Sequence, residues 1–126
     1  MKPTILIFDD DAEILQICTI IMQSRGYTVV TQSDCDDVSQ KVRDSGADVI
    51  LMDNSIPVSG GIEATKTIKQ TENIKHIPVI FFSANSNVES MSLQAGAEYF
   101  LPKPFDIHEL ETLVTQAINN TPQPAS

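Results

Sequence analysis

The amino-acid sequence predicts an α/β domain built on a doubly wound, five-stranded parallel sheet. Five short apolar segments alternate with five segments of helical periodicity, and the connections between them are short. This alternation is typical of right-handed β-α-β units, which place helices on both faces of a parallel sheet. The apolar runs are continuous, as expected for strands that are buried on both faces. The 126 residues suffice for one domain with its own hydrophobic core.

Each expected strand is a short apolar run that stops at polar or turn-forming residues. In chain order, the strands are expected at about 4–8, 27–31, 48–52, 78–82 and 98–101. Pro78 can open the fourth strand, because its missing N–H costs little at a first position.

Each expected helix combines apolar residues three and four apart with residues that suit its ends. In chain order, the first helix is expected at about 12–25, and the second follows the acidic run and ends at about 44. The other three are expected at about 62–71, at about 86–96 and from 106 onward. Gly26 suits the C-terminal cap of the first helix. The acidic run of Asp34, Asp36 and Asp37 is expected to cap the second.

The last two helices carry the clearest starting signals. Ser86–Glu89 and Asp106–Glu109 both have the form of a capping box. Serine and asparagine are poor helix formers, so the fourth helix is expected to be the least stable. The fifth helix is expected to bury five apolar residues: Ile107, Leu110, Leu113, Val114 and Ala117.

The composition excludes several classes of function. The formal charge is −9, with no local cluster of lysine and arginine, which argues against a surface for nucleic acid or anionic membranes. No apolar stretch approaches the ~20 residues of a membrane-spanning helix, and no secretory signal is recognisable. Cys18 and Cys35 lack paired spacing, so both are expected to be reduced thiols of a cytoplasmic protein.

Polar residues follow four of the expected strands. Asp9 and Asp10 follow the first, Asp53 the third, Ser83 the fourth and Lys103 the fifth. Ligands of parallel sheets bind beyond the carboxyl ends of the strands, so these side chains are expected to converge. Adjacent carboxylates repel one another unless a cation lies between them, and their hard oxygen atoms suit Mg²⁺. Alternatively, the acidic triplet 9–11 only caps the first helix, which leaves the acid at 53 unexplained.

Three of these residues suit phosphate chemistry. Asp53 can act as a nucleophile, because carboxylates form acyl phosphates in some phosphoryl-transfer systems. Ser83 can donate a hydrogen bond to a phosphoryl oxygen, and Lys103 can neutralise another. Taken singly, the serine can instead cap a turn and the lysine can be a solvated surface residue. Pro102 and Pro104 weaken that alternative for the lysine, because they fix the backbone around it.

Four motifs together resemble one known family. The segments ILIFDDD, VILMDNSIP followed by GG, VIFFSA and GAEYFLPKPF are similar, in order and over about residues 3–120, to the receiver domain of two-component response regulators, of the chemotaxis-regulator type. The resemblance implies a flavodoxin-like (βα)5 fold with strand order 2-1-3-4-5. It also implies a receiver domain over residues 1–120 and a polar C-terminal tail over residues 121–126.

The resemblance gives roles to the acidic residues and their neighbours. It implies that Asp53 accepts a phosphoryl group from a phosphohistidine. Asp9 and Asp10 would hold Mg²⁺ together with Asp53 and the backbone carbonyl of Ser55. Ser55 and Asn85 would flank the path of the hydrolytic water and tune the lifetime of the acyl phosphate.

The resemblance also implies a switch. Ser83 and Phe100 would be its two switch positions, and Lys103 would contact the phosphoryl group from a cis peptide bond to Pro104. Phe100 lacks a hydroxyl, so its contribution would rest on packing. The segment between Ser83 and Lys103 is shorter than in many receivers. Asp11 is left as a helix-capping or peripheral residue.

The predicted function is a phosphorylation-dependent signalling switch of a two-component system. A histidine kinase or a histidine phosphotransfer protein would phosphorylate the chain, which would promote its own phosphorylation and dephosphorylation. The surface of helix 4, strand 5 and helix 5 would pass the change to a downstream protein or to a phosphorylation-dependent homodimer. No direct contact with nucleic acid or membrane is expected. The chain is either a stand-alone receiver or part of a longer protein.

Two other functions remain as alternatives. An aspartyl-phosphate phosphatase of the haloacid-dehalogenase type would use Asp9 as its nucleophile. Glu13 stands where that family places Thr or Val, however, and the chain lacks a cap domain. A receiver-fold binding module that is never phosphorylated is the other alternative. It predicts missing site residues, yet all five are present.

Overall fold

The computed structural model describes residues 2–56 and 60–120 and contains one five-stranded sheet. All strand pairs are parallel, and the strand order is β2-β1-β3-β4-β5. The strands are β1 (Thr4–Phe8), β2 (Thr28–Gln32), β3 (Val49–Asp53), β4 (Val79–Ser83) and β5 (Tyr99–Pro102). The predicted fold class and strand order are therefore confirmed. The expected tail at 121–126 lies outside the described residues.

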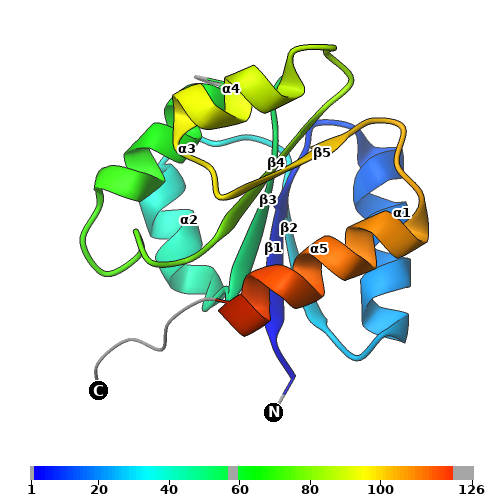
Figure 1. Cartoon of the computed structure of the whole chain (residues 1–126). Coiled ribbons are helices and arrows are strands. Elements are labelled where there is room, and N and C mark those ends of the chain that lie inside the picture. The colour runs from blue at the N-terminus through cyan, green and yellow to red at the C-terminus, as the bar shows by residue number, and fades with distance from the viewer. Residues whose placement is uncertain (1, 57–59, 121–126) are drawn as a thin grey trace.

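Helices cover both faces of the sheet (Figure 1). They are α1 (Ala12–Ser24), α2 (Val38–Ser45), α3 (Gly60–Gln70), α4 (Val88–Ala95) and α5 (Ile107–Asn120). α1 and α5 pack on one face, and α2, α3 and α4 pack on the other. In the described part of the chain, no helix combines the length and the apolarity that crossing a bilayer requires.

The core consists of two apolar layers that share the strands between them. In β1, Ile5 and Ile7 belong to the layer beneath α1 and α5, whereas Leu6 and Phe8 belong to the layer beneath α2, α3 and α4. All four side chains are fully buried. β3 and β4 alternate in the same way. Because both faces of each central strand are covered, its sequence is a continuous apolar run.

Three predicted residues at helix ends have the expected role. The Asp11 carboxylate accepts the backbone N–H of Glu13 at 2.9 Å and so caps α1. The Asp106 carboxylate accepts the N–H of Glu109 at 2.7 Å at the start of α5. Gly26 follows the C-terminal end of α1 with a φ of +93°, a conformation that favours glycine.

Two other predicted caps are wrong, because one helix begins at a different residue and the acids before the other make no capping hydrogen bond. α4 begins after Asn87 instead of Ser86, and the side chain of Asn85 accepts the Asn87 N–H at 2.8 Å. Asp37 precedes α2, but its side chain makes no capping hydrogen bond. Asp34 does not cap the helix either, because its carboxylate pairs with Lys41.

The prediction that α5 buries Ile107 is also wrong. Its side chain is 47% exposed, although Leu110 and Val114 on the same stripe are fully buried. Phe105 packs edge-on against Phe82, with ring centroids 6.2 Å apart, and fills this end of the layer. Ile107, in the first turn of α5, is therefore left outside the core.

A polar cluster ties α3 to the starts of β4 and β5. The Lys69 Nζ lies 2.7 Å from the carbonyl oxygen of Ile77 and 2.8 Å from a Glu98 carboxylate oxygen. The other oxygen of Glu98 accepts the N–H of Val79 at 2.8 Å. Because these groups precede the strands, the cluster lies at the end of the sheet opposite the strand tips.

The start of α3 packs directly against the end of β3. Gly61 donates its N–H to the Asn54 carbonyl at 3.0 Å. A Cβ at Gly61 would lie 2.3 Å from the backbone oxygen of Asp53, a distance that real Cβ atoms essentially never show. Glycine is therefore required here for close approach of two backbone segments.

Replacing Gly61 with alanine should displace the loop that follows Asp53. We expect a loss of unfolding free energy of about 1–3 kcal/mol, typical of overpacking, together with weaker Mg²⁺ binding. Urea denaturation and Mg²⁺ titration measure the two effects. Gly46→Ala is the control, because Gly46 has a φ of +65° but an open surrounding. It should lose stability only, and equal Mg²⁺ affinity in all three proteins would contradict the prediction.

Candidate functional site

The carboxyl ends of four strands converge on one open cleft of about 360 Å³. Asp53 and Ser83 are the last residues of β3 and β4, whereas Asp9 and Lys103 directly follow β1 and β5. Parallel pairing places Asp53 beside Phe82 and Ser83 beside Pro102, so the strand tips align. The cleft is lined by ten residues: Asp9, Asp10, Asp11, Asp53, Asn54, Ser55, Ser83, Ala84, Asn85 and Lys103.

Three carboxylates form an acidic cluster in this cleft. One oxygen each from Asp9, Asp10 and Asp53 lies within 4.8 Å of the others. Asp9 is fully buried and Asp53 is 4% exposed, whereas Asp10 is open to solvent. Ligands on opposite sides of an octahedral Mg²⁺ are about 4.2 Å apart, twice its usual ligand distance. The three oxygens are therefore nearly close enough to share one such cation, and their hard oxygen chemistry suits Mg²⁺.

Lys103 joins the two buried carboxylates. Its Nζ lies 3.0 Å from Asp9 Oδ2 and 3.0 Å from Asp53 Oδ1, and it stands 4.6 Å from the centroid of the Phe82 ring. Its backbone N–H donates to the Ser83 carbonyl at 2.9 Å, and the following bond to Pro104 is cis. Burial alone would lower the pKa of Lys103, but its hydrogen bonds to the two carboxylates outweigh burial and raise it.

Asp53 experiences opposing electrostatic effects. Burial raises the pKa of its carboxyl group, and the negative charges of Asp9 and Asp10 raise it further. The hydrogen bond from Lys103 opposes both effects without cancelling them. The ionised form of Asp53 is thus held in an environment that favours an additional cation.

Of the remaining predicted site residues, some line the cleft and one does not. Ser83 is 4% exposed, and its Oγ accepts the N–H of Asn85 at 3.0 Å. Asn85 and Ser55 line the cleft and are exposed. Phe100 does not line it, because its side chain, 36% exposed, borders a separate groove between β5 and α5.

Sequence reasoning misses two contacts near the site. The glycine pair at 60–61 gives no sign that the close approach of α3 to Asp53 depends on Gly61. The apolar run of β4 gives no sign that the Phe82 ring faces the Lys103 ammonium group. Burial, with the nearby charge of Asp9, raises the pKa of the Cys18 thiol to about 11, so this cysteine is unreactive at neutral pH. No sequence motif marks these contacts.

The fold and the site together define a flavodoxin-like α/β domain with an acidic cleft at its strand tips. The chain belongs to the response regulator receiver domain family, whose model matches residues 5–115. Members of this family are phosphorylation-dependent switches of two-component signalling rather than classical enzymes. The predicted family is therefore confirmed.

Several relatives are similar over nearly the whole chain. The receiver domain of a sensor histidine kinase from Pseudomonas aeruginosa, solved with magnesium coordinated in its active-site cleft, is 30% identical, with a TM-score of 0.87 over 95% of this chain and 100% of that one. The chemotaxis response regulator CheY4 of Vibrio cholerae is 26% identical, with a TM-score of 0.85 over 93% of this chain and 99% of that one.

Curated relatives are mostly much longer. The transcriptional regulator NtrC of Escherichia coli is 33% identical over 90% of this chain but only 24% of its own length. For the phosphate regulon regulator PhoB of Pseudomonas aeruginosa, the identity is 28% over 94% of this chain and 52% of the relative. The chain thus spans about half or less of the curated relatives it matches.

The raised pKa of Asp53 predicts that Asp53→Asn stabilises the metal-free protein. The pKa of Asp53 is higher in the folded protein than in the unfolded protein, so the ionised carboxylate destabilises the fold. This destabilisation is complete at a pH above the pKa in the folded protein. It is absent at a pH below the pKa in the unfolded protein, which is near 4. We therefore expect the variant to melt a few degrees higher at pH 7 in EDTA, with the difference disappearing as the pH falls through that window.

Thermal melts from pH 3 to pH 8 test this prediction, with Asp36→Asn as the control for loss of an exposed carboxylate. The control should show no comparable gain at pH 7. Mg²⁺ should raise the melting temperature of the unmodified protein more than that of Asp53→Asn. A variant that is less stable than the unmodified protein at pH 7 in EDTA would refute the electrostatic argument.

Proposed function

We propose that Asp53 accepts a phosphoryl group while Asp9, Asp10, Asp53 and the backbone carbonyl of Ser55 hold Mg²⁺. The availability of the Asp53 carboxylate carries this proposal. Its Oδ1 accepts a hydrogen bond from the Lys103 ammonium group, and Asp53 lines the open cleft. An ionised carboxylate oxygen at an open cleft is positioned to act as a nucleophile.

The contacts of Asp9 argue against the phosphatase alternative. Its Oδ1 accepts the N–H of Asp11 at 2.9 Å, and its Oδ2 accepts from Lys103 at 3.0 Å. The side chain is fully buried and each of its oxygens already accepts a hydrogen bond from the protein, which disfavours attack on a substrate. Asp9 is therefore better suited to holding the metal ion, and Asp53 is better suited to attacking phosphorus.

The transfer step is a displacement at phosphorus. An oxygen of Asp53 forms a P–O bond as the P–N bond to a donor histidine breaks, and the imidazole leaves. Bound Mg²⁺ would neutralise charge on the phosphoryl oxygens. Lys103 can pair with one of these oxygens and the Ser83 hydroxyl can donate to another. These groups would let the domain promote its own phosphorylation, while Ser55 and Asn85 flank the water that later hydrolyses the acyl phosphate.

The readout begins at Ser83. Donation to a phosphoryl oxygen reorients the hydroxyl that now accepts the Asn85 N–H, and Asn85 in turn holds the start of α4. Phe100 lies beside Phe81 on the neighbouring strand, with an exposed side chain that can repack. We infer that phosphorylation changes the α4-β5-α5 surface through these contacts.

The proposed partners follow from this chemistry. The donor is a histidine kinase or a histidine phosphotransfer protein, and the recipient is a downstream protein or another domain of the same polypeptide. The length of the curated relatives supports the last possibility. We propose that residues 1–120 form the receiver domain, that it acts in the cytoplasm, and that it contacts neither nucleic acid nor membrane directly, in agreement with its net charge of −9.

Beryllofluoride with Mg²⁺, which mimics the aspartyl phosphate, should shift the backbone NMR signals of Asp53, Ser83 and Asn85. Asp53→Asn should abolish the shifts, and it should also abolish labelling by a small phosphodonor such as acetyl phosphate. Ser83→Ala should bind beryllofluoride but show weaker changes at α4. The receiver assignment fails if unmodified protein shows no shifts, or if it releases phosphate from an added phosphomonoester in a manner that Asp9→Asn abolishes and Asp53→Asn does not.

A further inference from the structure

A shallow apolar groove of about 350 Å³ lies between β5 and α5, apart from the acidic cleft. Phe100 and Leu101 of β5 form one side, and Thr112 and Leu113 of α5 form the other. Figure 1 shows β5 running between α4 and α5. Two more large apolar side chains on these helices, Leu93 and Ile107, are 73% and 47% exposed. Ile17 and Ile20 of α1 are exposed as well, so exposure alone does not distinguish this face; what distinguishes it is that its apolar residues line a hollow.

The elements around this groove carry almost only negative charge. Over residues 84–120 the sequence contains five acids, Glu89, Glu98, Asp106, Glu109 and Glu111, and a single lysine or arginine. That residue, Lys103, is held by the carboxylates of the cleft. Of the residues that line the groove, only His108 is basic.

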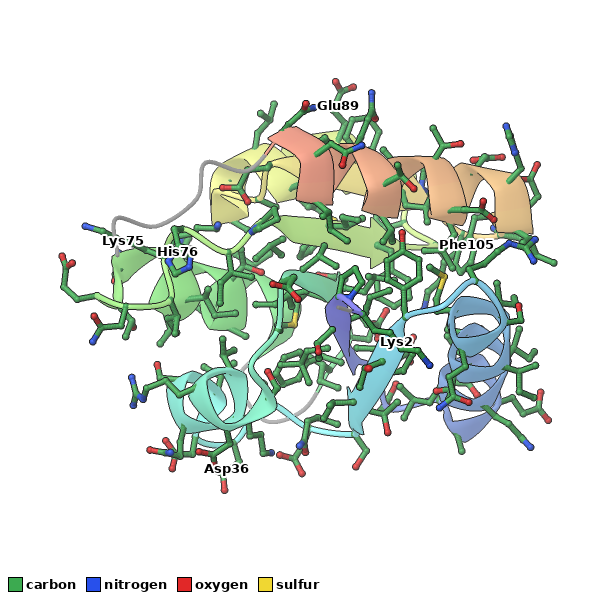
Figure 2. All side chains as sticks on the ribbon, turned by 90° about the horizontal axis from the view of Figure 1, so that it is seen from below. Lys2, Asp36, Lys75, His76, Glu89 and Phe105 are labelled. Carbon is green, nitrogen blue, oxygen red and sulfur yellow. The ribbon has the colours of Figure 1, made fainter. Side chains whose placement is uncertain are left out.

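Three of the five acids lack a neutralising partner. Glu98 pairs with Lys69, and Glu111 pairs with Arg25. In contrast, no described lysine or arginine forms a salt bridge with Glu89, Asp106 or Glu109. Figure 2 shows Glu89 projecting outward from the edge of the molecule. Glu109 lines the groove itself, so uncompensated negative charge lies at the apolar surface.

This charge pattern disfavours a symmetric dimer through the same face. A two-fold interface places one surface patch against an identical patch, so the acids of each copy would face acids of the other. The two copies would have no free lysine or arginine on α4, β5 or α5 with which to pair. Like charges opposed across an interface are unfavourable.

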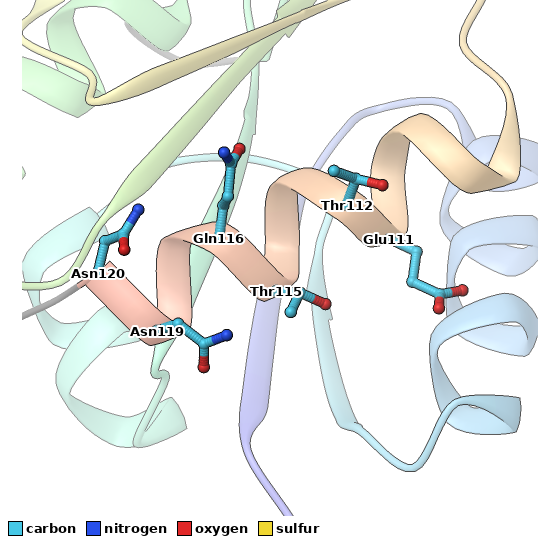
Figure 3. Close-up of a pocket in the computed structure, with 6 residues that line it drawn as sticks. All are labelled: Glu111, Thr112, Thr115, Gln116, Asn119 and Asn120. Carbon is cyan, nitrogen blue, oxygen red and sulfur yellow. The ribbon is translucent and has the colours of Figure 1, made fainter.

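Polar side chains along α5 limit the apolar surface. A stripe of polar side chains follows the solvent side of the helix: Glu111, Thr112, Thr115, Gln116, Asn119 and Asn120 (Figure 3). These side chains border a second shallow hollow, of about 320 Å³, which offers no apolar anchor site. A partner that buries apolar side chains would therefore contact the apolar residues of the groove, Phe100, Leu101 and Leu113.

We propose that the β5–α5 groove binds a cationic amphipathic segment of a partner protein. Apolar side chains of that segment would cover Phe100 and Leu113, and its lysines or arginines would pair with Glu89 and Glu109. The inference rests on the proposed function, because it names the partner chemistry for the surface that phosphorylation is proposed to alter. Charge complementarity selects the cationic segment over a second copy of this chain.

Two synthetic helix-forming peptides test the proposal. Both carry the same leucine stripe, but one has lysines on its flanks and the other has glutamates. NMR titrations are run with and without beryllofluoride and Mg²⁺. We expect the lysine peptide to bind, with shifts concentrated at Phe100, Leu101 and Leu113 and with an affinity that falls as salt is added. The glutamate peptide should not bind.

Matched charge variants identify the acids involved. Glu89→Gln and Glu109→Gln should each lower the affinity for the lysine peptide several-fold. Asp36 lies at the opposite edge of the molecule (Figure 2), so Asp36→Asn should leave that affinity unchanged. Thermal melts establish that all three variants fold. Equal weakening by all three would show non-specific attraction and overturn the proposal, as would equal binding of both peptides or no binding.

Sedimentation of the activated protein provides a further test, because a dimer whose shifts map to the groove would also overturn the proposal. The NMR shifts that beryllofluoride causes at Asp53 and Ser83 test the proposed function separately. If those shifts occur and the lysine peptide does not bind, only the partner inference fails. If they are absent, the proposed function fails, whatever the peptides do.

Discussion

The structure depends on a charge imbalance at the ends of its central strands. Two buried carboxylates, Asp9 and Asp53, share the single ammonium group of Lys103, and Asp10 adds a third negative charge nearby. A parallel sheet makes this arrangement unavoidable, because the residue after each strand is delivered to the same edge. The apolar core holds the strands in register and so prevents the carboxylates from moving apart. The remaining attraction for cations is the chemical property on which the family's signalling is based.

The elements that the sequence predicted well are those whose physical cause is local or periodic. Continuous apolar runs identified the strands because both sheet faces are covered, and the strand ends located Asp53 and Lys103 without any knowledge of contacts. The errors arose at the starts of helices. Asn87 rather than Ser86 precedes α4, and Phe105 packs in the layer from which Ile107 is left out. These outcomes depend on which side chains meet in the folded protein, and the spacing of residues along the sequence does not show this.

The cleft and the β5–α5 groove are connected by adjacent strands rather than by a shared cavity. Ser83 ends β4 beside Pro102 of β5, and Phe81 lies beside Phe100 two residues earlier. The loop after Ser83 is short, and its hydrogen bonds pass from the Ser83 hydroxyl to Asn85 and on to the first residues of α4. A change at the strand tips therefore reaches both sides of the edge strand within a few residues. No long chain of intermediates is needed.

The cluster of Lys69 and Glu98 gives this edge strand a mechanical asymmetry. β5 is anchored at its beginning, where Glu98 is bonded to both the Lys69 ammonium group and the backbone of Val79. Its other end leads to Lys103, whose partners are the carboxylates of Asp9 and Asp53. A change in the contacts of Lys103 would therefore act first on the Pro102 end of the strand, while the Glu98 contacts hold its beginning, so the output surface would tilt instead of sliding as a whole.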